Sequence, residues 1–178
     1  MQEEEKKGQI LTKRTLWVMA VLCTLGVLAY NTVLASCYEA PAEGVQWRRC
    51  YMDGEDFSGL SLEKAELRES SFTRATLHQT NLRHTDARRA KFIRTILTEA
   101  QFTNANLREA DFTKANADGA DFSGAILDRA RFFEASLRGA NFTGASMHAT
   151  DLLKADVSGA TWIDGTTICK EGSLGQCR

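Results

Sequence analysis

The most restrictive feature of this sequence is an apolar residue at every fifth position from Trp47 to Trp162. All 24 residues of this series are apolar, with no break in register. Two residues before each of these centres lies a small residue. Of the 21 such positions from 60 to 160, 15 are Ala and four are Thr, and the other two are Ser70 and Leu60. The residue between the small one and the centre is often Asp or Asn, as at Asp86 and Asn106.

Neither an α-helix nor a flat strand can bury residues at this spacing. Five residues advance about 500° around a helix, so the apolar positions would spiral around it instead of forming one stripe. A strand needs inward positions every second residue, and five is odd. The remaining solution places the small residue and the centre inward and then turns the chain by about 90°. Four such sides close a square coil of about 20 residues, and successive coils stack about 4.8 Å apart.

The repeated unit A(D/N)Lxx, which runs through residues 45–165, resembles the pentapeptide repeat family. The resemblance implies an all-β fold, a right-handed quadrilateral β-helix, and the number of units predicts about six coils. A 20-residue period predicts that like residues stack on one another. The predicted columns are Phe72, Phe92, Phe112, Phe132 and Leu152 on one face, and Leu82, Phe102, Phe122, Phe142 and Trp162 on another.

The chain divides into four predicted segments. Residues 1–36 form a signal peptide or a membrane anchor, because four basic residues precede the uncharged stretch 16–35, which is long enough to span a bilayer. A cleaved signal and a retained anchor both remain open. Residues 37–44 are a lead-in with Cys37, residues 45–165 the β-helix, and residues 166–178 a cap over its last coil.

The cysteines lie at the two ends of the repeat region, with none between residues 51 and 168. In an exported chain this favours two short-range disulfides, Cys37 with Cys50 and Cys169 with Cys177. The sequence before Cys37 also resembles a bacterial lipobox, so lipidation of Cys37 is an alternative that would leave Cys50 unpaired. Zinc is a weaker alternative, because neither pair has the spacing of a zinc knuckle.

No catalytic constellation is found in the sequence, and we expect no enzyme activity, cofactor or metal. His78, His84 and His148 fall at different phases of the coil and are interpreted as solvated surface residues. The Asp residues occupy the Asp/Asn slot of the repeat, where such side chains typically bond backbone at corners. A lyase of the parallel β-helix type is disfavoured, because no carboxylate or basic cluster marks a groove.

Charged residues predict ladders and two candidate partner surfaces. Residues 69, 89, 109 and 129 alternate in sign, as do residues 91, 111, 131 and 151, which predicts ion pairs between coils. One candidate surface is a stack of unopposed arginines within a locally basic region, and the other is an outward apolar column. The predicted surface residues are Arg68, Arg88 and Arg108 in the first, and Ile93, Phe133 and Leu153 in the second.

These features favour a non-enzymatic, exported scaffold or protein-binding module of the bacterial cell envelope or periplasm. The expected partner is an envelope protein or an anionic surface, and a membrane contact would use the N-terminal segment or a lipidated Cys37. Nucleic acid is not expected, since 22 basic and 23 acidic residues leave a net charge of −1. The alternative, implied by the family resemblance, is a DNA mimic that binds gyrase and protects it from quinolones.

Overall fold

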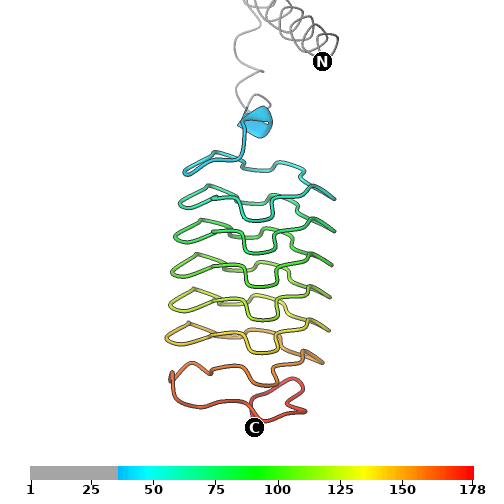
Figure 1. Cartoon of the computed structure of the whole chain (residues 1–178), viewed down its shortest axis with the longest axis vertical. Coiled ribbons are helices and arrows are strands. Elements are labelled where there is room, and N and C mark those ends of the chain that lie inside the picture. Colours follow the sequence, from blue (N-terminus) through cyan, green and yellow to red (C-terminus); the bar gives the residue numbers. More distant parts are fainter. Residues whose placement is uncertain (1–35) are drawn as a thin grey trace, which may run out of the picture. The chain divides into compact units, whose positions relative to one another are not determined.

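The computed structural model describes residues 36–178, which form a stack of four-sided coils (Figure 1). Twenty parallel β-bridges each join a residue to the one 20 positions later, from Gln46 with Glu66 to Asn141 with Thr161. Each coil begins four such bridges, one on each of its sides. The predicted coil period is thus confirmed. Within the described range, each side contributes only an isolated bridge, and the one helix is the 3-10 helix η2, Ser36–Tyr38.

Each five-residue unit satisfies its own backbone donors in a fixed way, as residues 111–115 illustrate. The Asp111 N–H donates to the preceding coil, and those of Phe112 and Lys114 donate to the next one. The Ala115 N–H donates back across the corner to the Phe112 carbonyl at 2.9 Å. The Thr113 N–H donates to Oδ1 of Asp111, also at 2.9 Å. Because a buried or half-buried backbone donor needs a partner, this last bond explains the Asp/Asn preference of the slot.

The same bond, from the N–H two residues later to an Asp or Asn side chain, recurs along the rod and confirms the interpretation of these residues as corner caps. The acceptors are Asp56, Asn81, Asp86, Asn106, Asp111, Asn116, Asp121, Asn141, Asp151 and Asp156.

The corners place their third residue in the left-handed region of backbone space. Glycine occupies this position at some corners, such as Gly124 with φ of 65°. Sixteen residues other than glycine also adopt it, with φ between 54° and 61°, among them Lys114 and Ala149. A left-handed conformation costs a residue with a Cβ about 1 kcal/mol or more, so the inter-coil bonds of the solenoid hold these residues there.

The core is a tube of stacked side chains, and the predicted phenylalanine columns are confirmed. Phe112 stacks on Phe92 and Phe132 with ring centroids 4.9 and 4.6 Å apart and planes within 12°. Rings of the opposite column meet them edge-on, as Phe102 does at 5.9 Å. These rings are fully buried. Each buried Phe or Leu contributes roughly 2 kcal/mol.

The two ends of the coil stack differ. At the N-terminal end Trp47 is buried, and its indole N–H donates to the Glu39 carbonyl at 3.2 Å. At the C-terminal end the chain reverses, and residues 166–178 cross the last coil with two antiparallel bridges, Asp156 with Leu174 and Thr161 with Ile168. This segment therefore covers backbone groups that the last coil would otherwise leave open.

Disulfides lie at both ends. Cys37 is bonded to Cys50 and Cys169 to Cys177, the two pairs that the sequence favours. Since a sulfur in a disulfide has no thiol for acylation, this arrangement does not accommodate a lipid on Cys37. The predicted signal or anchor segment and Cys23 lie outside the described residues. From residue 36 onward, no helix is long and apolar enough to cross a membrane.

Candidate docking face

One side of the rod gathers a dense set of arginines, and we call it the arginine face. It consists of residues 46–50, 66–70, 86–90, 106–110, 126–130 and 146–150, which the bridges hold in register. Arg48, Arg68, Arg88 and Arg108 form one column on it, each at the residue that follows a buried centre. A second column, at the left-handed corner position, contains Glu69, Arg89, Glu109 and Arg129.

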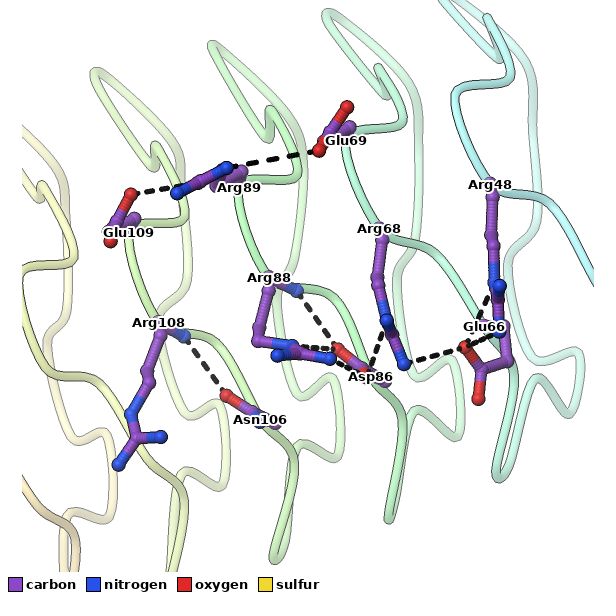
Figure 2. Close-up of polar contacts among 10 residues, drawn as sticks. All are labelled: Arg48, Glu66, Arg68, Glu69, Asp86, Arg88, Arg89, Asn106, Arg108 and Glu109. Carbon is purple, nitrogen blue, oxygen red and sulfur yellow. Dashed lines mark hydrogen bonds and ion pairs between the residues drawn. The ribbon is translucent and has the colours of Figure 1, made fainter.

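The prediction that Arg68, Arg88 and Arg108 are unopposed was wrong for all three, since Arg108 Nε also lies 3.4 Å from Asp128 Oδ2. Arg68 Nε lies 2.7 Å from Asp86 Oδ2, and Arg88 Nε lies 2.9 Å from Asp86 Oδ1 (Figure 2). Arg48 likewise pairs with Glu66 at 2.8 Å. The partners of Arg48 and Arg68 belong to the neighbouring column of the next coil. A comparison of residues in the same column therefore overlooks them, although a long arginine side chain reaches diagonally to them.

This pairing shifts the pKa values of Asp86 and Arg88 in the N-terminal half of the face. Partial burial alone would raise the pKa of Asp86, but hydrogen bonds from Arg88 and Arg68 outweigh it and hold the pKa below its ordinary value. The same hydrogen bond from Arg88 to Asp86 raises the pKa of Arg88. Asp86 and Arg88 thus remain charged near neutral pH, and the carboxylate of Asp86 offsets part of the charge of the two arginines.

The predicted ladder of alternating charges is confirmed at the corner column. Arg89 Nε lies 2.9 Å from Glu109 Oε2, and Arg89 also approaches Glu69 at 3.9 Å (Figure 2). Arg129 approaches Glu109 at 3.9 Å, and Arg49 extends the ladder toward the N-terminus by pairing with Glu69 at 2.9 Å. In the second predicted ladder, Arg131 lies 4.0 Å from both Asp111 and Asp151. Lys91 makes no ion pair within 4.0 Å among residues 36–178.

A shallow groove runs between the arginine column and the ladder. Its hollow nearer the N-terminus, of about 320 Å³, is lined by Arg68, Arg88 and Arg108 on one side and by Glu69, Arg89 and Glu109 on the other. A second hollow, of about 370 Å³, continues it toward the C-terminus and shares Arg108 and Glu109 with the first. Arg108 therefore lies where the two hollows meet.

The other predicted surface is less continuous. Ile93 and Phe133 are half-buried and Leu153 is 60% exposed, and Thr113 separates Ile93 from Phe133 in the column. The Lys154 ammonium lies 5.4 Å from the centre of the Phe133 ring. A partner for this apolar column stays a prediction.

The histidines are not brought together. His78 Nδ1 lies 2.7 Å from Thr98 Oγ1, and His84 is exposed. His148 lines the hollow of the arginine face that lies toward the C-terminus. Residues 36–178 contain no group of three or more side chains suited to holding a metal ion.

Sequence reasoning named Asp86 without pairing it with the arginines, and it missed Glu66, Asp128 and Ile126, which also shape this face. A signal for Glu66 and Asp86 was present in the sequence. Each lies two residues before one arginine of the column, and the 20-residue period places it next to the arginine of the preceding coil. Asp128 lies in the arginine column itself, one coil after Arg108, with its Oδ2 3.4 Å from Arg108 Nε.

Comparison with known proteins places the chain in a family. The model of the pentapeptide repeat region matches residues 65–142 and 85–162, which together cover more than half of the chain. No curated protein sequence matches it.

Three solved structures illustrate the likeness. HetL, a pentapeptide repeat protein involved in heterocyst differentiation regulation in Nostoc sp. PCC 7120, is 25% identical over 69% of this chain, with a TM-score of 0.48. This chain spans 66% of HetL. A pentapeptide repeat protein of the Arabidopsis thaliana thylakoid lumen is 25% identical over 73% of this chain and 85% of its own, with a TM-score of 0.35. QnrB1, a plasmid-mediated fluoroquinolone resistance protein, is 19% identical over 73% of this chain and 81% of its own, with a TM-score of 0.34.

Pentapeptide repeat proteins are generally non-enzymatic structural or binding proteins. They share a right-handed quadrilateral β-helix, in agreement with the four bridges per coil of this chain. The chain therefore belongs to the pentapeptide repeat family.

Proposed function

We propose that this protein is an exported, non-enzymatic β-helix that binds a partner in the bacterial cell envelope. The observation that supports this most directly is the pair of disulfides, one at each end of the described rod. Disulfides persist in oxidising compartments and are rare in the cytosol. The predicted signal or anchor segment at residues 1–36 agrees with the same compartment.

The arginine face is the proposed docking surface. Its groove is presented on a rigid backbone, since every coil is bonded to the next on all four sides. Arginine is enriched at protein interfaces because its planar guanidinium can bind carboxylates in a bidentate way. A rigid scaffold with such side chains already in place loses little conformational entropy on binding.

The DNA-mimic alternative gains no support from this face. It carries seven arginines against five carboxylates, whereas a mimic of the DNA backbone must present an excess of negative charge. Binding in the cytosol would also expose both disulfides to reduction.

Compartment and oxidation state provide the first test. After cell fractionation, we expect the protein in the envelope or periplasmic fraction, and its intact mass without reductant should lack four hydrogens relative to the free thiols. A cytosolic chain with free thiols would contradict the proposal. A mass increase from acyl chains on Cys37 would contradict the first disulfide.

Binding is tested separately by photo-crosslinking in intact cells. A photoreactive residue in place of His148, which lines the groove, should capture a defined partner. The same residue in place of Gln79, which lies exposed on the opposite side of the coil, is the matched control. Equal capture at both positions, or none at 148, would remove the arginine face as the docking surface.

A further inference from the structure

The arginine column follows a pairing rule that stops halfway along the rod. Arg48 pairs with Glu66 and Arg68 with Asp86, in each case the residue 18 positions later. By this rule Arg88 would pair with residue 106 and Arg108 with residue 126. Position 106 is Asn and position 126 is Ile, so Arg88 turns back to Asp86 and Arg108 finds no carboxylate there.

Arg108 is nevertheless held in place. Its Nε lies 3.4 Å from Asp128 Oδ2, while Oδ1 of Asp128 accepts hydrogen bonds from the Ser146 hydroxyl at 2.5 Å and the His148 N–H at 3.2 Å. The two terminal nitrogens of Arg108 make no side-chain hydrogen bond within residues 36–178. In Figure 2 Arg88 and Arg68 are turned toward Asp86, and the guanidinium of Arg108, to their left, is not.

The ladder stops one coil later. Its alternation places Glu69 after Arg49 and Glu109 after Arg89, so an acid is expected after Arg129, at position 149. That position is Ala149. Glu109 is engaged with Arg89 at 2.9 Å and lies 3.9 Å from Arg129, whose side chain is 75% exposed. The column of Glu66 and Asp86 therefore lacks a carboxylate at positions 106 and 126, and the ladder lacks one at position 149.

Arg108 and Arg129, the arginines left without these acids, line one hollow of about 370 Å³ together with Ala149. We propose that this hollow is the recognition site for an acidic segment of a partner protein, whose carboxylates bind Arg108 and Arg129 in place of the acids missing at positions 126 and 149. The inference rests on the proposed binding function and names the chemistry of the partner.

The surroundings favour a protein segment over a uniformly charged polymer. Glu109 and Asp128 line the same hollow, so a polyanion such as an acidic polysaccharide would bring like charges against them at each step. A segment with one or two carboxylates can avoid these acids. Ile126, half-buried beside the arginine column, offers an apolar contact to a neighbouring side chain of the partner.

Two substitutions should block the site by supplying the missing acids from the protein itself. Ile126→Asp supplies the acid at the position where Glu66 and Asp86 pair with their arginines, and Ala149→Glu completes the ladder. Both residue types already occupy these positions elsewhere in the repeat, so the fold should be retained. Ile126→Asn and Ala149→Gln are neutral controls, and Arg94→Gln removes a charge from a side chain that makes no ion pair within residues 36–178.

The probe is a short peptide that alternates leucine and glutamate, compared with the same peptide containing glutamine and with polygalacturonate. Binding to the oxidised protein is measured by calorimetry at low and high salt. We expect the glutamate peptide to bind, and Arg108→Gln or the closed variant Ile126→Asp with Ala149→Glu to weaken it about tenfold to a hundredfold. The neutral controls and Arg94→Gln should bind within about twofold of the unaltered protein.

Equal binding of the glutamine peptide, no binding of the glutamate peptide, or a closed variant that binds as well as its neutral control would overturn this assignment. Tighter Arg108-dependent binding of polygalacturonate would overturn it as well, in favour of a polysaccharide. None of these results alters the fractionation or crosslinking experiments, so the proposed function can stand when the assignment of the partner's chemistry fails. Circular dichroism of each variant verifies the fold.

Discussion

The interior of the coils and the arginine face share one 20-residue repeat, but only the interior follows it at every level. All 24 centre positions are apolar, and most are buried from Trp47 onward. On the arginine face the acid column ends at Asn106 and Ile126, and the ladder ends at Ala149. An interior gap would leave a cavity, whereas an outer gap leaves a charged side chain available to a ligand. In a repeat fold, departures from the outer pattern are therefore informative about binding.

The largest effect should come from interrupting the interior. Phe112→Ala removes a fully buried ring that stacks on two others, so we expect a loss of roughly 3–5 kcal/mol in the free energy of unfolding. Phe133→Ala, at the next residue after the centre Phe132, removes a half-buried outward ring and should cost about 1 kcal/mol or less. Denaturant unfolding of both variants measures the contrast, and similar losses would contradict the inward and outward assignments.

A smaller effect of opposite sign is expected at a corner. Ala149 has φ of 56°, a conformation that glycine adopts without steric cost. Ala149→Gly should therefore stabilise the protein by about 0.5–1 kcal/mol, despite the greater freedom of glycine in the unfolded chain. Thermal unfolding is the measurement. A lower melting temperature would mean that this corner is not held in the left-handed region.

The charge ladder should contribute still less. Glu109→Gln breaks the contact with Arg89 at 2.9 Å and the longer one with Arg129 at 3.9 Å, both at the exposed surface. We expect a loss of about 0.2–1 kcal/mol. The difference from the unaltered protein should shrink at high salt, because exposed charges are then screened. A salt-independent loss well above this range would show that the ladder stabilises the fold by something other than exposed ion pairs.

The smallest expected effect concerns the cap at acid pH. Hydrogen bonds from the Thr167 hydroxyl and from the N–H groups of Thr167 and Thr166 lower the pKa of Asp164 from 3.8 to about 2. Because the folded-state pKa is lowered, the stabilisation is present above pH 3.8 and is lost as the pH falls toward 2. The melting temperatures of the protein and of Asp164→Asn should therefore converge over this interval. A constant gap would argue against the Asp164 turn.

The interior could be predicted from sequence because one requirement, burial at a five-residue spacing, leaves a single backbone solution. That solution also determines the columns, so the stacking of Phe92, Phe112 and Phe132 followed directly. The arginine face was predicted only in part. Arg68 and Arg88 were expected without partners because only residues of the same column were compared, while a flexible guanidinium reaches a carboxylate in the neighbouring column. Which of several nearby acids a long side chain selects depends on distances that the spacing alone does not specify.

The regular bridge from each residue to the one 20 positions later has a consequence for how such a chain can change in evolution. An insertion of one five-residue unit keeps every following centre apolar and inward, so the tube tolerates it. It also rotates all later columns by one side of the square, which would move Arg108 away from the column of Arg68 and Arg88. Only insertions or deletions of whole coils lengthen or shorten the rod while preserving its surface. Insertion of a single unit would instead present a new combination of side chains on each face while the core keeps its fold.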